Sequence, residues 1–81
     1  MHQFLNDPVE VTVDFSGRRV RPKEVRWSNR SYPTPRCTLV HGAREGLKRV
    51  FYFSVSDDSN FMKLRFDTET LEWRLVEFYA G

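Results

Sequence analysis

Few side chains of this sequence have the type and spacing that chemistry requires. Cys37 follows Arg36 and precedes His41 by four positions, and positive neighbours favour the thiolate form that acts as a nucleophile. A free cysteine is more often a small apolar residue packed in a strand, and we expect that role for Cys37. The adjacent acids Asp57 and Asp58 lie among turn-forming residues, where carboxylates solvate a loop more often than they bind a metal ion.

Other catalytic and metal-binding patterns are missing from the sequence. A serine-protease triad needs a histidine that links a nucleophile to a carboxylate, and the two histidines, His2 and His41, occupy a terminus and a loop edge. One cysteine and two histidines do not give the usual spacing of a zinc site, and no glycine-rich phosphate-binding motif occurs. The sequence therefore predicts a protein that is not an enzyme, with no catalytic residue, cofactor, metal ion or small-molecule substrate.

The segment from Arg26 to Arg36 interleaves arginines with two aromatic residues and contains no acid. Nucleic-acid sites combine cations for the phosphates with flat rings for the bases. This combination predicts contact with a nucleic acid or another polyanion through Arg26, Trp27, Arg30, Tyr32, Arg36, Arg44, Lys48 and Arg49. In the alternative, Trp27 and Tyr32 belong to the core, because Trp27 shares its alternation phase with the apolar Val25, and only the arginines face solvent.

The charges are unevenly distributed along the chain, although the net charge is only +2. Residues 18–49 carry ten cations and two anions, whereas residues 1–17 carry three anions and residues 50–81 carry six anions against three cations. In one interpretation the acidic strands pair with the basic ones and the charges cancel across the sheet. In the other, the basic third forms a positive face that attracts phosphate.

The apolar pattern predicts strands and no long helix. Residues 9–15 alternate strictly between apolar and polar side chains, which is typical of a half-buried strand. Further strands are expected at residues 19–27, 37–41, 50–55, 61–66 and 71–79, and residues 50–55 are expected in a central position because both of their faces are apolar. Five or six strands at intervals of about ten residues predict an all-β fold, a small antiparallel barrel or bent sheet that is SH3-like.

Several positions predict interruptions of these strands. Pro22 requires an edge or a bulge because proline cannot donate to a neighbouring strand, and a phase slip after Val76 indicates a bulge or a strand end. The Asp67 carboxylate is expected to accept backbone N–H groups in a tight turn. Residues 41–46 are expected to form a loop, and the spacing of charges at residues 44–48 is compatible with a short helical turn.

Length and composition limit the organisation of the protein. A chain of 81 residues supplies one domain, because two would each be too small to bury a core, and we expect residues 1–7 and 80–81 to be frayed. A single cysteine excludes an internal disulfide, so the core must come from aromatic residues. No apolar stretch is long enough to span a membrane and the start lacks the pattern of a secretory signal, so we expect a cytoplasmic protein.

Three short stretches resemble a family of small uncharacterised bacterial domains. The chain has the turn Gly17-Arg18-Arg19, then VRWSNRSY at residues 25–32 and WRLVE at residues 73–77; the family shows G-x-P, F-x-W-x-G-R-x-Y and Y-W-R-V-E. The chain differs at Asn29, where the family has glycine, and in a longer middle loop. Members of the family are sometimes associated with operons of DNA-damage polymerases. The resemblance implies a non-enzymatic accessory β-domain of unknown function and favours association with nucleic acid.

Together these patterns predict a small non-catalytic binding domain. Contact with a nucleic acid or another polyanion through residues 18–49 is the first hypothesis. The alternative is a protein-interaction or homodimerisation module that pairs edge strands or uses an exposed aromatic patch. The exposure of Trp27 and Tyr32 separates the two hypotheses, because rings that are buried in a core cannot stack on bases.

Overall fold

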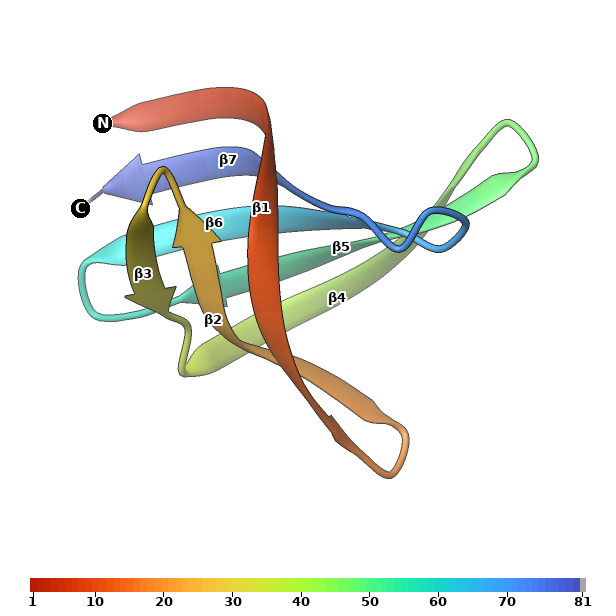
Figure 1. The fold of residues 1–81 in the computed structure, drawn as a ribbon, viewed down its shortest axis with the longest axis horizontal. Coiled ribbons are helices and arrows are strands. Elements are labelled where there is room, and N and C mark those ends of the chain that lie inside the picture. The colour runs from red at the N-terminus through yellow and green to blue at the C-terminus, as the bar shows by residue number, and fades with distance from the viewer. Residues whose placement is uncertain (81) are drawn as a thin grey trace.

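The computed structural model describes residues 1–80, which form strands and turns (Figure 1). The strands are β1 His2–Ser16, β2 Arg19–Trp27, β3 Arg30–Pro33, β4 Arg36–Glu45, β5 Lys48–Ser56, β6 Asn60–Asp67 and β7 Trp73–Ala80. They form one sheet in the order β3-β2-β1-β7-β6-β5-β4, in which every pair of neighbours is antiparallel. The predicted all-β antiparallel fold is confirmed, with seven strands instead of five or six. The sheet is not closed, because β3 and β4 stand at its two ends and do not pair with each other.

The long strand β1 bends the sheet, because its two halves pair with different neighbours. Residues 2–9 pair with β7, and residues 10–16 pair with β2. The β1–β2 hairpin consequently leaves the plane of β4–β7 and crosses in front of those strands, as Figure 1 shows. The two parts of the sheet therefore face each other like two layers, and the apolar faces of both can be buried between them.

The core lies between these two layers. Its buried residues are Val25 of β2, Phe53 and Val55 of β5, Met62 and Leu64 of β6, and Leu75 of β7. Met62 and Leu64 of β6 face into this core, and Phe66 of the same strand is partly buried against it. The strand β5 is also confirmed as an interior strand, since it pairs with β4 on one side and with β6 on the other.

Three two-residue turns fix the registers of the hairpins. They consist of Gly17-Arg18, Ser28-Asn29 and Gly46-Leu47. The φ angles of Gly17 and Gly46 are 60° and 66°, which glycine adopts without steric cost. Ser28 and Asn29 also have positive φ, as a type I′ turn requires. Asn29 has a φ of 64°, a conformation that asparagine tolerates better than most residues, so asparagine can stand where the resembling family has glycine.

Both predicted irregularities are present in the sheet. The register of β1 against β2 shifts between Thr12 and Val13, next to Pro22. On its other side Pro22 lies beyond the pairing of β2 with β3, which covers residues 24–27, and Thr34 contacts this part of the strand: its N–H donates to the Lys23 carbonyl and its hydroxyl to the Pro22 carbonyl. The pairing of β7 with both of its neighbours skips Val76, which is the extra residue of a bulge.

Three expectations about the ends of strands are wrong. Residues 41–46 do not form a loop and residues 44–48 do not form a helical turn, because β4 continues to Glu45. A Cβ on Gly42 would lie 3.3 Å from the Phe51 ring, so this glycine fits under a ring within the sheet. Residues 1–7 are not frayed, because β1 pairs with β7 from His2 onward, and the N-terminal ammonium donates to the Ala80 carbonyl. Position 81 lies outside the described residues.

Among residues 1–80, no helix of the length and apolar character needed to cross a membrane is found.

Candidate functional site

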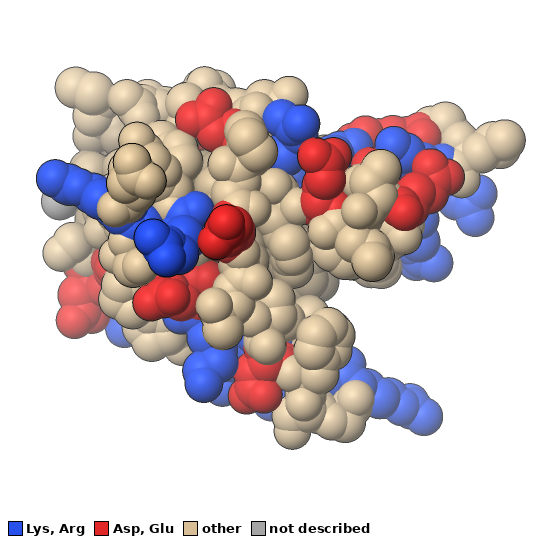
Figure 2. Space-filling view, viewed as in Figure 1, with Lys and Arg blue, Asp and Glu red and all other residues tan. Residues whose placement is uncertain are grey.

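An apolar cleft opens between the β1–β2 hairpin and the concave face of β4–β7. The cleft has a volume of about 580 Å³. It is lined by Val13, Phe15, Arg18 and Val20 on the hairpin side, and by Val40, Phe51, Phe53, Phe66, Leu71 and Trp73 on the other. In Figure 2 the surface is hollowed at this place, between the tip of the β1–β2 hairpin and the lobe that carries the β4–β5 hairpin. Concave, mostly apolar surfaces of this volume are typical of binding sites.

Several apolar side chains around the cleft are exposed. The exposed fraction is 74% for Phe15, 67% for Leu71 and 50% for Val40. Apolar residues that are exposed singly need no explanation, but a contiguous group marks an interaction surface. Leu71 also has a φ of 62°, a conformation that costs roughly 1–2 kcal/mol for a residue other than glycine. This conformation belongs to the turn between β6 and β7, in which the Leu71 N–H donates to the Asp67 carbonyl at 2.8 Å and the Asp67 N–H donates to the Glu72 carbonyl at 3.0 Å.

Trp27 and Tyr32, the rings predicted to stack on bases, are half-buried and packed against other rings. The centroid of the Trp27 ring lies 5.1 Å from that of Phe78 and 6.1 Å from that of Tyr32. The indole Nε1 donates a hydrogen bond of 2.9 Å to Oδ2 of Asp7, and both rings border the core. The two rings thus have the core-packing role that the sequence left as the alternative.

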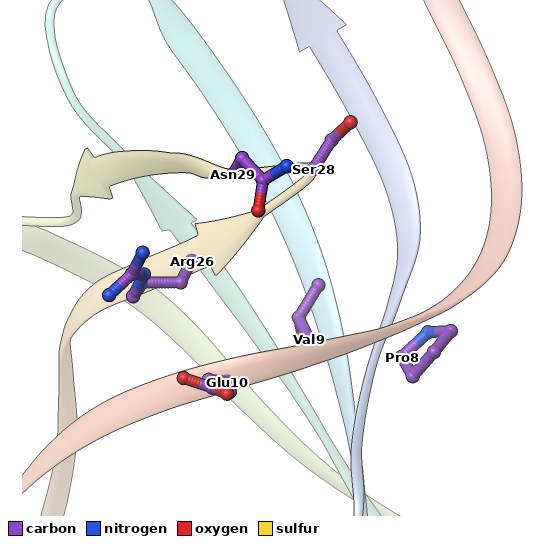
Figure 3. A pocket seen from close by; sticks show the side chains of 6 residues that line it. All are labelled: Pro8, Val9, Glu10, Arg26, Ser28 and Asn29. Atoms are coloured by element: carbon purple, nitrogen blue, oxygen red, sulfur yellow. The ribbon is translucent and has the colours of Figure 1, made fainter.

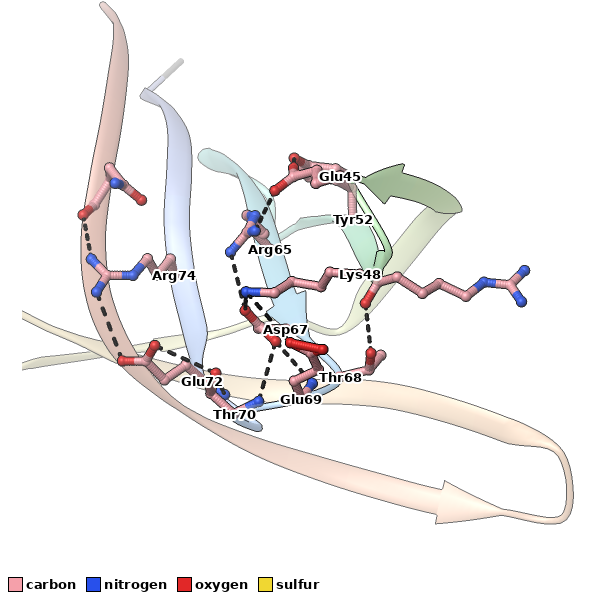
Figure 4. A network of polar contacts seen from close by, with 12 residues as sticks. Glu45, Lys48, Tyr52, Arg65, Asp67, Thr68, Glu69, Thr70, Glu72 and Arg74 are labelled. Carbon is pink, nitrogen blue, oxygen red and sulfur yellow. Dashed lines mark hydrogen bonds and ion pairs between the residues drawn. The ribbon is translucent and has the colours of Figure 1, made fainter.

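Lys48, another predicted contact residue, is held in a network of polar contacts (Figure 4). Its Nζ lies 2.8 Å from Oδ2 of Asp67 and 4.0 Å from Glu69. Asp67 is only 4% exposed, and it also accepts the N–H groups of Glu69 and Thr70, which confirms the predicted turn. The Lys48 hydrogen bond, aided by these N–H groups, lowers the pKa of Asp67 to about 2. Lys48 thus neutralises a buried carboxylate instead of facing a ligand.

Other ion pairs also join the basic middle of the chain to its acidic last third. Arg36 forms an exposed pair with Asp58 at 2.9 Å. In the network of Figure 4, Arg65 lies between Glu45 and Asp67. The pairs of Arg36 with Asp58 and of Lys48 with Asp67 agree with the interpretation in which charges cancel across the sheet, whereas Arg65 pairs with Glu45, an acid of the basic segment, and neutralises none of its cations.

Arg26 lines a shallow groove on the outer surface of β1 and β2 (Figure 3). The groove has a volume of about 470 Å³ and is also lined by Pro8, Val9, Glu10, Ser28 and Asn29. Glu10 and Arg26 stand opposite each other in the pairing of β1 with β2. A carboxylate beside the arginine weakens the attraction for phosphate, so this groove is a poor site for a polyanion.

Eight cations make no ion pair with another described residue. They are Arg18, Arg19, Arg21, Lys23, Arg26, Arg30, Arg44 and Arg49. Three of them border the apolar cleft. Arg18 lines it, the guanidinium of Arg49 lies 5.4 Å from the centroid of the Phe51 ring on its floor, and Arg44 stands opposite Arg49 in the pairing of β4 with β5. Figure 2 shows basic side chains at the tips of both lobes.

Cys37 and Asp57, which the sequence offered for nucleophilic chemistry and metal binding, lie in surroundings that favour a structural role. Burial raises the pKa of the Cys37 thiol above its ordinary value, against the smaller opposite effects of a hydrogen bond with the Leu39 backbone and of the Arg21 charge. A nucleophilic thiol needs the reverse shift. Asp57 accepts the N–H groups of Ser59 and Asn60 and so orders its loop. Within residues 1–80, no group of three or more histidine, cysteine or acidic side chains could hold a metal ion.

The residues of the apolar cleft were not identified from the sequence as a site. The alternation predicts that Phe15 lies on the covered face of its strand, and the strand expected at residues 71–79 includes Leu71, whereas β7 begins at Trp73. A signal was available in the β1–β2 hairpin, where the apolar Val13, Phe15 and Val20 flank the Gly17 turn. The tip of a hairpin often extends beyond the layer beneath it, so apolar residues there predict an exposed surface.

Comparison of the chain with protein-family models, with curated proteins and with solved structures finds no match. The fold and the site define it as an open, all-β domain with an apolar cleft and unpaired arginines at the rim of that cleft.

Proposed function

We propose that the protein is a small non-catalytic domain that binds a protein partner through the apolar cleft. The observation that carries the proposal is the contiguous exposure of Phe15, Val40 and Leu71 around a concave surface with an aromatic floor. Burial of apolar area stabilises a complex by roughly 25 cal/mol per Å² before the costs of association are subtracted. Exposed rings in a cleft are the kind of residue that carries most of the binding energy at protein interfaces.

The charge at the rim indicates the chemistry of the partner. Arg18, Arg44 and Arg49 are unpaired, and they border an apolar surface that presents no acid of its own. The complementary ligand is a protein segment with apolar side chains and an acidic flank. The proposal places the protein in the cytoplasm, where its single cysteine stays reduced, and takes the curvature of its sheet to be SH3-like.

A peptide-display selection tests this function. A library of random peptides is selected on the wild-type protein after depletion on the variant Phe15→Ser, whose exposed position at the end of β1 leaves the core intact. We expect enriched peptides to be apolar with acidic residues at one end. No enrichment over the variant, or a consensus of basic peptides, would refute binding in the cleft.

A second function, contact with a polyanion, is favoured by one observation. All eight unpaired cations belong to residues 18–49, as the first sequence hypothesis requires. Fluorescence polarisation of labelled single- and double-stranded oligonucleotides across a salt series tests it. The hypothesis expects affinity that falls steeply with salt and weakens in Arg18→Ala/Arg19→Ala. No binding at about 50 mM salt, where phosphate contacts are strong, would exclude this function.

A further inference from the structure

We propose, building on the binding function above, that the partner adds an extended strand to the free edge of β4. The added strand runs antiparallel to β4 and directs every second side chain into the apolar cleft. The ligand that provides this strand is a peptide segment with an apolar residue at every second position and an acidic N-terminal end. Three independent features of β4 lead to this inference: its unprotected edge, its place beside the cleft, and an uncompensated pair of arginines near its end.

The regular part of the β4 edge lacks the usual protection. The strand pairs only with β5, and after a bulge at Thr38 its pairing is regular from Leu39 to Glu45. Proteins protect free edges with charged residues, proline, bulges or short strands, because an exposed edge recruits other strands. Residues 39–43 of β4 contain no bulge, lysine, arginine, acid or proline.

The other free edges of the sheet do carry such protection. The strand β3 has only four residues and ends in Pro33. The part of β2 beyond β3 carries Arg19 and Arg21, and Thr34 covers its edge at Pro22 and Lys23 by donating to both of their carbonyls. The contrast singles out β4 as the edge that is open to an additional strand.

The free edge also borders the cleft. Val40 is 50% exposed and lines it, and it stands opposite Phe53 in the pairing with β5. In the same pairing Gly42 faces Phe51, so alternate positions of β4 lie on the concave side of the sheet. Side chains of neighbouring strands point to the same face at the same level. A strand beside β4 would therefore direct its alternate side chains to the concave face, next to Val40 and Gly42 at the border of the cleft.

The arginines near the end of β4 fix the polarity of the ligand. Arg44 and Arg49 are directly opposite each other, and like charges in this arrangement are destabilising. Neither forms an ion pair with a described residue. A carboxylate from the ligand would relieve this repulsion. Because Arg44 lies next to the last residue of β4, the N-terminal end of an antiparallel strand reaches it.

The test uses a labelled synthetic peptide of alternating valine and threonine, as long as the ten residues of β4, with two glutamates at its N-terminus. Binding to the full chain is measured by fluorescence anisotropy. Two further peptides carry N-methyl groups on either the odd or the even backbone amides, because only alternate amides of an added strand donate to its neighbour. We expect one methylated series to lose at least tenfold in affinity and the other to retain it.

Variants of the protein and of the peptide distinguish the possible failures. We expect the protein variant Arg44→Glu to weaken binding of the glutamate peptide at least tenfold. A peptide with two lysines in place of the glutamates should bind the wild-type protein equally weakly, and it should bind Arg44→Glu with restored affinity. Equal binding of both methylated series, with loss in Phe15→Ser, would retain the cleft as a binding site but refute strand addition. Two results would refute both proposals. One is that Phe15→Ser does not weaken peptide binding; the other is that no peptide binds and the display selection also fails. Dimerisation of the free protein, lost in Val40→Lys and measured by light scattering, would show that a second copy occupies the edge.

Discussion

The backbone conformation of Leu71 makes a prediction whose sign is opposite to the usual rule. In most positions glycine is less stable than alanine by roughly 0.5–1 kcal/mol, because it loses more conformational freedom on folding. Leu71 has a φ of 62°, where a residue with a Cβ pays roughly 1–2 kcal/mol and glycine pays nothing. We therefore expect Leu71→Gly to be more stable than Leu71→Ala, by the difference of these two effects, about 0.5–1 kcal/mol.

Comparing the two variants with each other removes the side-chain contribution. Both lose the contacts of the leucine side chain, which is 67% exposed, so these contacts cancel in the difference. Thermal unfolding followed by circular dichroism is the assay. For a domain of this size, 1 kcal/mol corresponds to roughly 4–8 °C in Tm, so Leu71→Gly should melt about 2–8 °C above Leu71→Ala.

Leu47 provides the matched control. It is fully exposed, also lies in a turn, and is not among the residues with positive φ. There we expect Leu47→Gly to melt below Leu47→Ala. If glycine is also the less stable substitution at position 71, the argument from the left-handed conformation is refuted. Both Leu71 variants should also bind the peptide more weakly, because the leucine lines the cleft.

Three further predictions follow from the contacts of other residues. The pKa of Asp67 in the folded protein is about 2, below its ordinary value of 3.8, so its contribution to stability is fully present above pH 4 and is lost as the pH falls from about 4 to 2. When the free energy of unfolding is measured across this pH range, Asp67→Asn should lose less stability than the wild type. An equal loss in the two proteins would contradict the role of Lys48. Replacing Asn29 with valine should destabilise the β2–β3 turn by roughly 1–2 kcal/mol, whereas Asn29→Gly should leave the midpoint of urea unfolding nearly unchanged, because φ at this position is 64°. Trp27→Phe removes the hydrogen bond to Asp7 and should cost about 1 kcal/mol of stability without changing oligonucleotide affinity, and a selective loss of that affinity would restore the stacking hypothesis.

Local chemistry made much of the fold predictable from the sequence. Pro22 lacks an N–H group and Val76 breaks an alternation, and both properties act within one or two residues, so the bulges could be located in advance. Gly42 shows where such reasoning fails. Glycine indicates a turn when nothing else is known, but here it lies in β4 under the Phe51 ring, and that contact depends on the pairing with β5.

The candidate site was less predictable, because it depends on which charges and rings meet other parts of the chain. Lys48 and Arg49 are neighbours in the sequence and equal in charge. Lys48 meets the buried Asp67, whereas Arg49 lies over the Phe51 ring at the cleft. Trp27 likewise looked available for stacking until its packing against Phe78 was known. A count of cations along a segment measures the positive charge available, and the folded arrangement decides how much of it remains unpaired.

The strand pattern of β1 shows why the cleft in particular escapes a sequence argument. Val9, Val11, Val13 and Phe15 share one face, and alternation alone predicts that all four are covered. In the structure the first three are half-buried, but Phe15 is 74% exposed, because the hairpin extends past the strands beneath it. Alternation reports which face of a strand is apolar, and it carries no information on whether the chain supplies a cover for that face. Where nothing in the chain covers that face, its apolar side chains stay exposed and can contact a partner. Phe15 is such a side chain, and it lies across the cleft from the unprotected edge of β4.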